Sequence, residues 1–202
     1  MNFPSTVNVL KPTLVTGPAA PMLTLAQAKA HLRVLDTDQD AYISSLLPVV
    51  EAMMDGYTGD LGHCLVNQTW SQKMDFWPAR VDLPLRPVSA ISIIKYYDTQ
   101  NALQTWASTN YGLYEDALGP FIQYPFNVQP PNLYPFRPDA IEIQFVAGYG
   151  PDATTIPAPI VQAALLWLAD MFENRETMTD VVITPIPKAA ERLISRYYRV
   201  GI

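Results

Sequence analysis

Residues that carry most enzyme chemistry are scarce in this chain. It contains one cysteine, Cys64, and two histidines, His31 and His63. Neither histidine belongs to an HExxH pattern or has a partner at metal-ligand spacing. His63 and Cys64 are chain neighbours in an expected turn, so they cannot face each other as a catalytic dyad. We therefore predict no catalytic residue, no cofactor and no metal ion. A lone cysteine also fits assembly in a reducing cytoplasm.

Longer signatures are missing as well. No glycine-rich phosphate loop occurs, because the GYGP of residues 148–151 lacks the third glycine and reads as a turn. No GxSxG is present, and no run of about 18 apolar residues predicts a transmembrane helix. The first residues lack the basic and apolar regions of a signal peptide. Glu115 and Asp116 are a carboxylate pair of the kind that glycoside hydrolysis uses, but a solvated turn is the favoured interpretation.

Charge is also sparse. Charged residues make up 16% of the chain, apolar residues 49%, and the net charge is −6, whereas ordinary domains carry about a quarter charged residues. An acidic chain repels phosphates, so we expect no tight nonspecific binding of DNA. A weakly charged surface has to be covered, either within a core or between subunits, and composition alone leaves both possibilities open.

The hydrophobic pattern predicts an α+β fold with four helices. Apolar residues recur at helical spacing over residues 24–34, 38–57, 157–175 and 187–199. Thr24 and Gln27 form a capping-box pattern at the first helix. Asp38 is the expected N-cap of the second helix, and Gly59 is its expected stop.

The middle of the chain predicts β-structure. Strands are expected in the run of residues 66–76, at 88–97, near 104–107 and 111–114, and at 140–148, where Ile141, Ile143 and Phe145 alternate with polar residues. The fold class is therefore a helical bundle, residues 23–64 and 151–202, with a β-rich insertion, residues 65–150. Residues 1–22 contain four prolines and should form an extended arm, which is either frayed or lies on a neighbouring subunit.

A proline-rich segment, residues 119–138, combines six prolines with five aromatic residues. The aromatic residues are Phe121, Tyr124, Phe126, Tyr134 and Phe136. The prolines exclude a long helix or a central strand here, and five large aromatic side chains are too many for a loop in open water. These rings must cover the sheet of their own domain or bind a partner.

The last expected helix carries a basic stripe opposite its apolar side. Lys188, Arg192, Arg196 and Arg199 follow the spacing i, i+4, i+8 and i+11. Two interpretations stay open. The stripe is a solvated face that complements the helix dipole, or it contacts an acidic protein or passing DNA.

The order of these segments resembles the phage head–tail connector (adaptor) family of long-tailed bacteriophages and gene transfer agents. The resemblance is carried by PMLTLAQAKAHLRV and DQDAYISSLLPVVEAMMDGYTG at the start, by VNQTWSQKMDFWP and LPLRPVSAISIIKYYD in the strands, and by IEIQFVAGYG and IPAPIVQAALLWLADMFENRE towards the end. It covers about residues 22–199. The long arm and the expanded aromatic segment depart from the family pattern.

The resemblance implies a non-catalytic virion protein of the neck, assembled in the host cytoplasm. It implies a homo-oligomeric ring, commonly a dodecamer, beneath the portal protein, with a central channel for DNA and a platform for a tail or neck protein such as a stopper or tail terminator. Our interface hypothesis places the five aromatic residues and the four basic residues against such partners. A ring of subunits at −6 each would repel the duplex that passes through it.

Two other classes of function stay open from the sequence. A carbohydrate-binding module would use the aromatic residues of 121–136 as a sugar platform. A small hydrolase would use Glu115 or Asp116.

Overall fold

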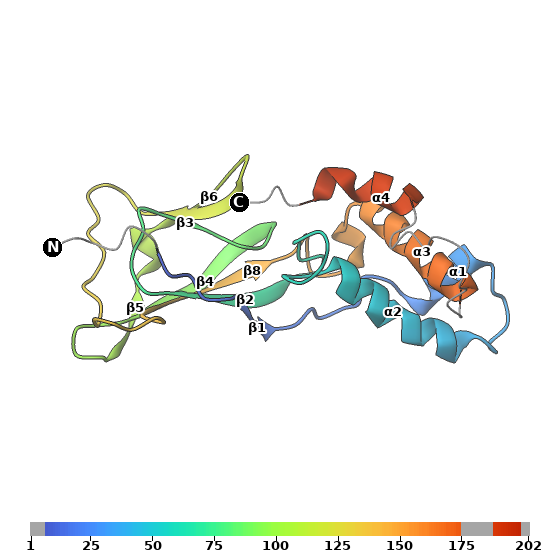
Figure 1. Ribbon diagram of the computed structural model, residues 1–202, viewed down its shortest axis with the longest axis horizontal. Helices are drawn as coiled ribbons and strands as arrows, with labels where there is room; N and C mark the ends of the chain where they lie inside the picture. Colours follow the sequence, from blue (N-terminus) through green and yellow to red (C-terminus); the bar gives the residue numbers. More distant parts are fainter. Residues whose placement is uncertain (1–6, 175–187, 199–202) are drawn as a thin grey trace, which may run out of the picture. The chain divides into compact units, whose positions relative to one another are not determined.

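The structure, a computed structural model, describes residues 7–174 and 188–198. Within them the fold is α+β, with four α-helices and two antiparallel sheets (Figure 1). The described residues divide into two compact units, one β-rich (residues 7–17 and 67–148) and one helical (residues 18–66, 149–174 and 188–198). The predicted α+β class is therefore confirmed.

The strands and helices have the following bounds. The strands are β1 (Thr13–Thr16), β2 (Gln68–Met74), β3 (Arg80–Asp82), β4 (Val88–Tyr97), β5 (Leu103–Trp106), β6 (Gly112–Asp116), β7 (Gly119–Gln123) and β8 (Ile141–Ala147). The helices are α1 (Leu25–Leu32), α2 (Asp40–Met54), α3 (Ala158–Glu173) and α4 (Lys188–Ile194).

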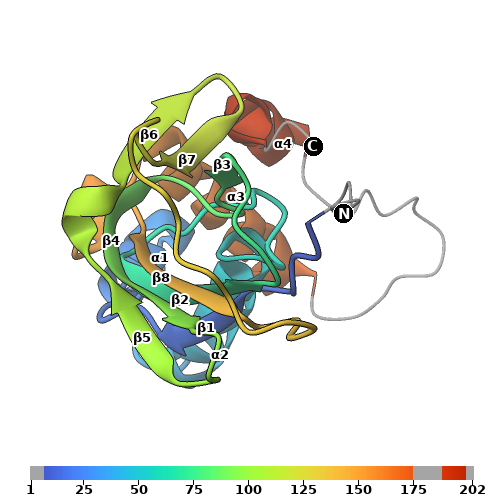
Figure 2. The same cartoon turned by 90° about the vertical axis from the view of Figure 1, so that its left-hand side faces the viewer.

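The larger sheet is built around β8. Its strand order is β1-β2-β8-β4-β5, and all neighbours are antiparallel (Figure 2). Along β8 every second residue is buried, as the alternation of the sequence predicts. Phe145 pairs with Trp70 of β2, and Ile143 pairs with Ile94 of β4. One face of the sheet is therefore apolar over three adjacent strands.

The smaller sheet has the order β3-β7-β6 and contains a proline that the sequence analysis excluded from a central strand. Pro120 lies in β7, the middle strand, opposite Glu115. Its carbonyl accepts a hydrogen bond from the Leu83 amide, on the side where β3 has already ended at Asp82. Within an antiparallel strand the N–H and C=O of one residue face the same neighbour. The missing N–H of Pro120 thus faces the side beyond the β3 ladder, and the exclusion was wrong.

The N-terminal segment joins the larger sheet of its own chain. Thr13 and Leu14 of β1 pair with Ser71 and Trp70 of β2, and the buried Gln72 side chain donates a hydrogen bond to the Leu10 carbonyl. The sequence analysis considered a frayed arm or one bound to a neighbour. Residues 9–16 instead form an edge of the sheet.

Helix α1 begins with the predicted capping box. The Gln27 amide donates to the Thr24 hydroxyl at 3.2 Å, and the Thr24 amide donates to the Gln27 side chain at 2.9 Å. Arg33 then adopts a left-handed conformation with φ of 59° and ends the helix. Ala28 is buried on the inner face, as its spacing indicates.

Helix α2 is shorter at both ends than its apolar pattern predicts. Asp38 is not the N-cap, because its amide bonds to the Asp36 carboxylate and Gln39 occupies the capping position. Gly59 is not the stop. The helix ends at Met54 because Asp55 is extended and its carboxylate accepts a hydrogen bond from the Leu65 amide at 2.6 Å.

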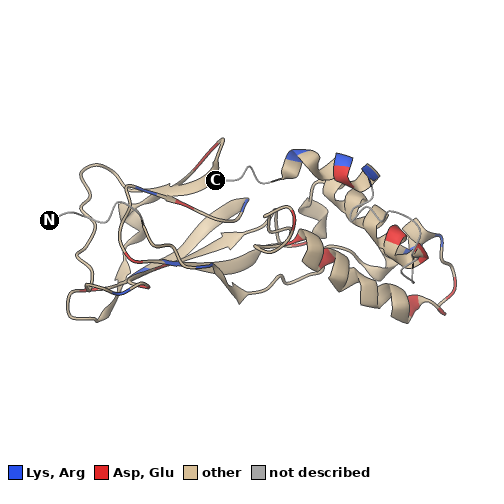
Figure 3. Cartoon of the chain, viewed as in Figure 1, with Lys and Arg blue, Asp and Glu red and all other residues tan. Residues whose placement is uncertain are grey.

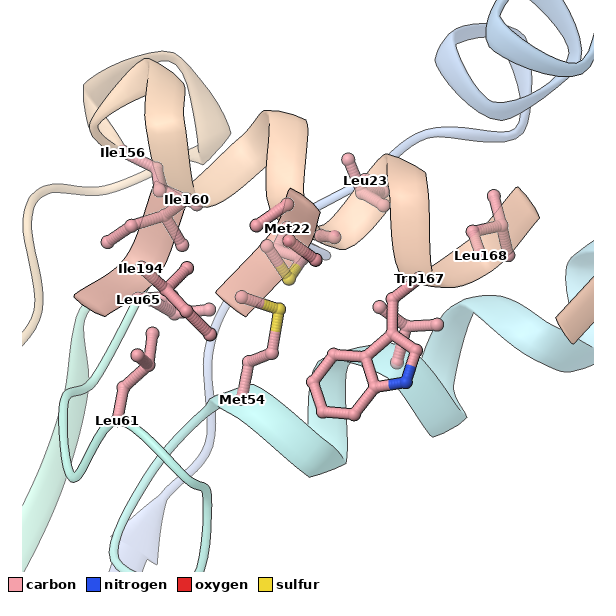
Figure 4. Packing of buried hydrophobic residues seen from close by; sticks show 14 of the residues in the cluster. Met22, Leu23, Met54, Leu61, Leu65, Ile156, Ile160, Trp167, Leu168 and Ile194 are labelled. Atoms are coloured by element: carbon pink, nitrogen blue, oxygen red, sulfur yellow. The ribbon is translucent and has the colours of Figure 1, made fainter. Parts of the chain in front are cut away.

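The helical unit closes over one hydrophobic core. Helices α3 and α4 contribute Ile160, Trp167, Leu168 and Ile194, which meet Met54, Leu61 and Leu65 (Figure 4). The predicted apolar face of residues 157–175 is thus confirmed. Helix α4 ends at Ile194 and continues as a 3-10 turn, Ser195–Tyr197, so it is shorter than predicted.

Candidate partner interface

The aromatic segment divides into covered and uncovered rings. The Phe121 ring lies under the Arg80 guanidinium, 3.7 Å from its centroid, and stacks on Tyr114. The Tyr124 ring contacts Trp106 of β5 at a centroid distance of 5.7 Å. These two rings therefore cover strands of their own unit, which is one of the two roles that the sequence left open.

The other three predicted residues face outward. Phe126 and Phe136 are fully exposed, at 102% and 105% of the reference area, and Tyr134 is exposed at 38%. Residues 119–136 contain no charged side chain. Burying a phenylalanine ring is worth about 1.5–3 kcal/mol. Two such rings in water, on an uncharged surface, mark a surface suited to a partner.

Polar contacts hold this segment in place. The Trp77 indole donates to the Pro131 carbonyl at 3.0 Å, and the Tyr134 amide donates to the Tyr97 carbonyl at 2.9 Å. The Arg137 guanidinium lies over the Tyr97 ring and pairs with Asp139 at 2.7 Å. Together with the prolines, these contacts fix the backbone. A pre-ordered loop loses little conformational entropy when it binds a partner.

A groove runs beside the exposed Phe136 ring. It encloses about 900 Å³ and its lining includes Trp77, Pro130, Pro131, Leu133 and Phe136. Phe136 has a φ of +60°, a left-handed conformation that is uncommon for a bulky residue and costs of order 1–3 kcal/mol. Phe136 thus combines a strained backbone with a fully exposed apolar ring. Strained residues of this kind cluster at sites of binding.

The basic stripe is present on the described part of the last helix. Lys188, Arg192 and Arg196 are exposed, and Ile194 on the other side is buried. Arg199 lies outside the described residues. In Figure 3 the ribbon of α4 and of the turn after it carries several positions coloured as Lys or Arg. The described part of the last helix and of the turn after it therefore presents a basic surface.

The candidate carboxylates Glu115 and Asp116 lie at the end of β6. Asp116 accepts a hydrogen bond from Arg80 at 2.6 Å, and this bond lowers the pKa of its carboxyl to about 2. Such a group stays ionised near neutral pH and cannot donate a proton as a general acid. Asp116 therefore has a structural contact with Arg80, a partner that the sequence analysis missed because the two residues are distant in the chain.

The two histidines and the cysteine are buried or half-buried in the helical unit. His63 is buried, with its Nδ1 atom 2.9 Å from the Tyr149 hydroxyl, and Cys64 is buried beside it. His31 is half-buried on α1. Among the residues that the structure describes, no group of three His, Cys, Asp or Glu side chains is placed to hold a metal ion. Within the same residues no helix is long and apolar enough to span a bilayer.

Comparison with known proteins gives a family for part of the chain. Residues 22–109 match the model described as phage gp6-like head-tail connector protein. No curated protein matches the chain. Three solved chains share its fold at 21–22% identity, and each comparison covers 96% of this chain and 97% of the other. They come from the neck of an empty gene transfer agent particle (TM-score 0.75), a native virion (0.73) and a native neck (0.70).

The matching family model describes head-tail connector proteins, and the similar solved chains come from gene transfer agent particles. Residues 22–109 match the model of the phage gp6-like head-tail connector family, so the resemblance seen in the sequence is confirmed. The alternative of a carbohydrate-binding module is wrong, because the family match and the structural matches both lead to neck proteins. The sequence analysis found the aromatic residues but missed the groove beside them. Trp77 lines this groove, and it lies more than forty positions before the aromatic segment, residues 119–138, in the chain.

Proposed function

We propose that this protein is a structural subunit that assembles with copies of itself into a ring in the neck of a tailed-phage particle or gene transfer agent. The ring joins the portal protein of the head to a tail or neck protein and leaves a channel for DNA. The chain carries out no reaction of its own. One observation carries the proposal: the connector family matches residues 22–109, and the fold of neck chains extends over 96% of the sequence.

The symmetry of the similar particles supports a ring. Their necks were computed with C6 and C12 symmetry. A closed ring needs an interface in which two different surfaces of the same chain meet. We propose that residues 23–64 and 151–202 supply these surfaces and form the helical bundle of the ring, with residues 65–150 as an insertion. Residues 1–22 are an extended arm in this proposal, of which residues 9–16 lie on the sheet of that insertion. The copy number of twelve is part of the proposal.

The negative net charge of the chain supports the proposal of a channel through which DNA passes. Each subunit carries a formal charge of −6, so a ring of about twelve is strongly negative. A duplex in the channel is repelled by such a ring and slides without specific binding.

The exposed aromatic residues support contact with a second kind of partner. Phe126, Tyr134 and Phe136 present apolar area on a fixed loop, and large aromatic side chains are enriched among residues that dominate binding. We propose that this surface, together with Phe121 and Tyr124 behind it, docks the portal or the next neck protein. The basic residues Lys188, Arg192, Arg196 and Arg199 form a separate proposed contact, with an acidic protein surface.

The experiment is complementation of particles that lack this chain. Without it, electron microscopy should show filled heads and free tails that are not joined, and the wild-type chain should restore joining. The double variant Phe126→Ser, Phe136→Ser should fold and fail to restore joining. Leu118→Ser is the matched control, because Leu118 is an exposed apolar residue of the same unit, at 56%, and lies outside the proposed contacts. Normal joined particles in the absence of the chain would refute the proposed function.

A further inference from the structure

The helical unit carries opposite charges on separate surfaces, and we propose that these surfaces bind each other between adjacent copies. The basic face, defined as Lys188 and Arg192 of α4 and Arg196 of the 3-10 turn after it, would contact the acidic end of the next copy, defined as Asp36, Asp38, Asp170 and Glu173. The inference rests on the proposed function and specifies one interface of the ring.

The basic face is free to take a partner. All three side chains are exposed, and none of them forms an ion pair with another described residue. Glu191 is the one acid of α4. The apolar side of the helix is occupied, since Ala190 and Ile194 are buried in the core. The core thus fixes the direction in which the three cations point.

The acidic end is assembled from two segments that are distant in sequence. The Tyr42 hydroxyl, near the start of α2, donates to the Met171 carbonyl near the end of α3 at 3.3 Å, and its ring contacts Phe172. These contacts bring the loop that carries Asp36 and Asp38 to the last turn of α3.

Among the described residues, no base forms an ion pair with the carboxylates of this end. The four carboxylate residues are exposed. Asp40, next to them, is paired with Lys29, and Arg33 is the remaining base of the loop. The last turn of α3 contains no basic residue, although the negative end of a helix dipole favours one. A cation from outside would therefore stabilise this turn.

The two surfaces lie apart on the unit. Ile194 at the end of α4 packs near Ile160 in the first turn of α3 (Figure 4), whereas Glu173 is the last residue of α3, about 20 Å further along at 1.5 Å per residue. Within the described residues of one chain, no ion pair joins the two surfaces. Copies can join them head to tail, which is the arrangement that closes into a ring.

Charge pairs of this kind chiefly fix which surfaces meet and in what register. Exposed pairs add little affinity each, so apolar contacts must supply the rest. The inference is therefore about the geometry of the ring contact, and reversal of charge is its natural probe.

The first test is cross-linking of the full chain within assembled particles. In a Cys64→Ala background, Arg192→Cys and Glu173→Cys are combined in one chain and treated with a bismaleimide spacer. Head-to-tail contact should give a ladder of dimer, trimer and higher multimers. The control pair, Arg192→Cys with Glu115→Cys, should stay monomeric. Particles whose ring of this chain shows no ladder, or a ladder that stops at dimer, would overturn the inference and leave the proposed function standing.

The second test exchanges the charges. Arg192→Glu with Arg196→Glu, and Asp170→Lys with Glu173→Lys, should each lower head–tail joining by tenfold or more, while circular dichroism stays that of the wild type. Supplied together, the two variants offer each other opposite charges and should restore joining to within a few-fold of the wild type. Failure of the mixture to assemble, or normal assembly of either variant alone, would contradict the contact. Particles with no ring of this chain at all would instead refute the proposed function.

Discussion

Two phenylalanines of the β-rich unit show how differently the same side chain is used in this protein. Phe145 is fully buried in β8, and Phe136 is fully exposed beside the groove. We predict that Phe145→Ala lowers the free energy of unfolding by about 3–5 kcal/mol, since it leaves a cavity in the sheet core. Phe136→Ala should change it by less than about 0.5 kcal/mol. Urea denaturation of both variants measures this, and equal losses would contradict the assignment of core and surface.

Asp116 is a second case in which a residue is defined by its partner. Arg80 lowers the pKa of its carboxyl to about 2. NMR titration should find this midpoint, and Arg80→Gln should move it up towards the ordinary value of about 3.9. Asp98 is the matched control, because backbone N–H groups and Gln104 lower its pKa without Arg80. An unchanged Asp116 midpoint in the variant would contradict the contact.

The sign of the resulting pH dependence follows from that direction. A carboxyl whose pKa is lowered in the folded state contributes stability above its unfolded pKa of about 3.9. That contribution is lost as the pH falls through about 2, where the folded carboxyl takes up its proton.

The features of helices and strands that depend on residues close in the chain could be predicted from the sequence. The capping box at Thr24 and the alternation of β8 depend on neighbours within a few residues, and both were read from the sequence. The ends of α2 were misjudged, because Asp55 is drawn out of the helix by the Leu65 amide, ten residues away. Pro120 was misjudged because its tolerance depends on where the separate strand β3 ends. Contacts of this length leave no local pattern.

The cap of α1 gives a prediction at this scale. Thr24→Ala removes the hydroxyl that accepts the Gln27 amide, and loss of an N-cap costs about 1 kcal/mol. Ser44→Ala, an exposed position inside α2, is the control and should change the free energy of unfolding by less than about 0.5 kcal/mol. Denaturation curves that do not separate the two variants would show that the cap contributes nothing.

At the scale of the whole molecule, the small share of charged residues corresponds to apolar surface that stays exposed. The apolar residues are not all consumed by cores, because Phe126, Phe136 and Leu35 remain fully exposed on different units. The basic face and the acidic end likewise lack counterparts within the described chain. Exposed apolar rings and unpaired charges of this kind are what we expect on a subunit whose surfaces are covered by partners after assembly. The sequence predicted the aromatic and basic residues of these surfaces, but the groove and the acidic end required the fold to bring distant segments together.

The most direct measurement is a reconstruction by electron cryo-microscopy of the neck of particles that contain this protein. The account predicts a closed ring of copies of this chain between head and tail, with the helical and the β-rich unit each recognisable in the density of every copy. A neck built without this chain, or density that shows single copies with Phe126 and Phe136 in open solvent and no neighbouring subunit, would contradict it.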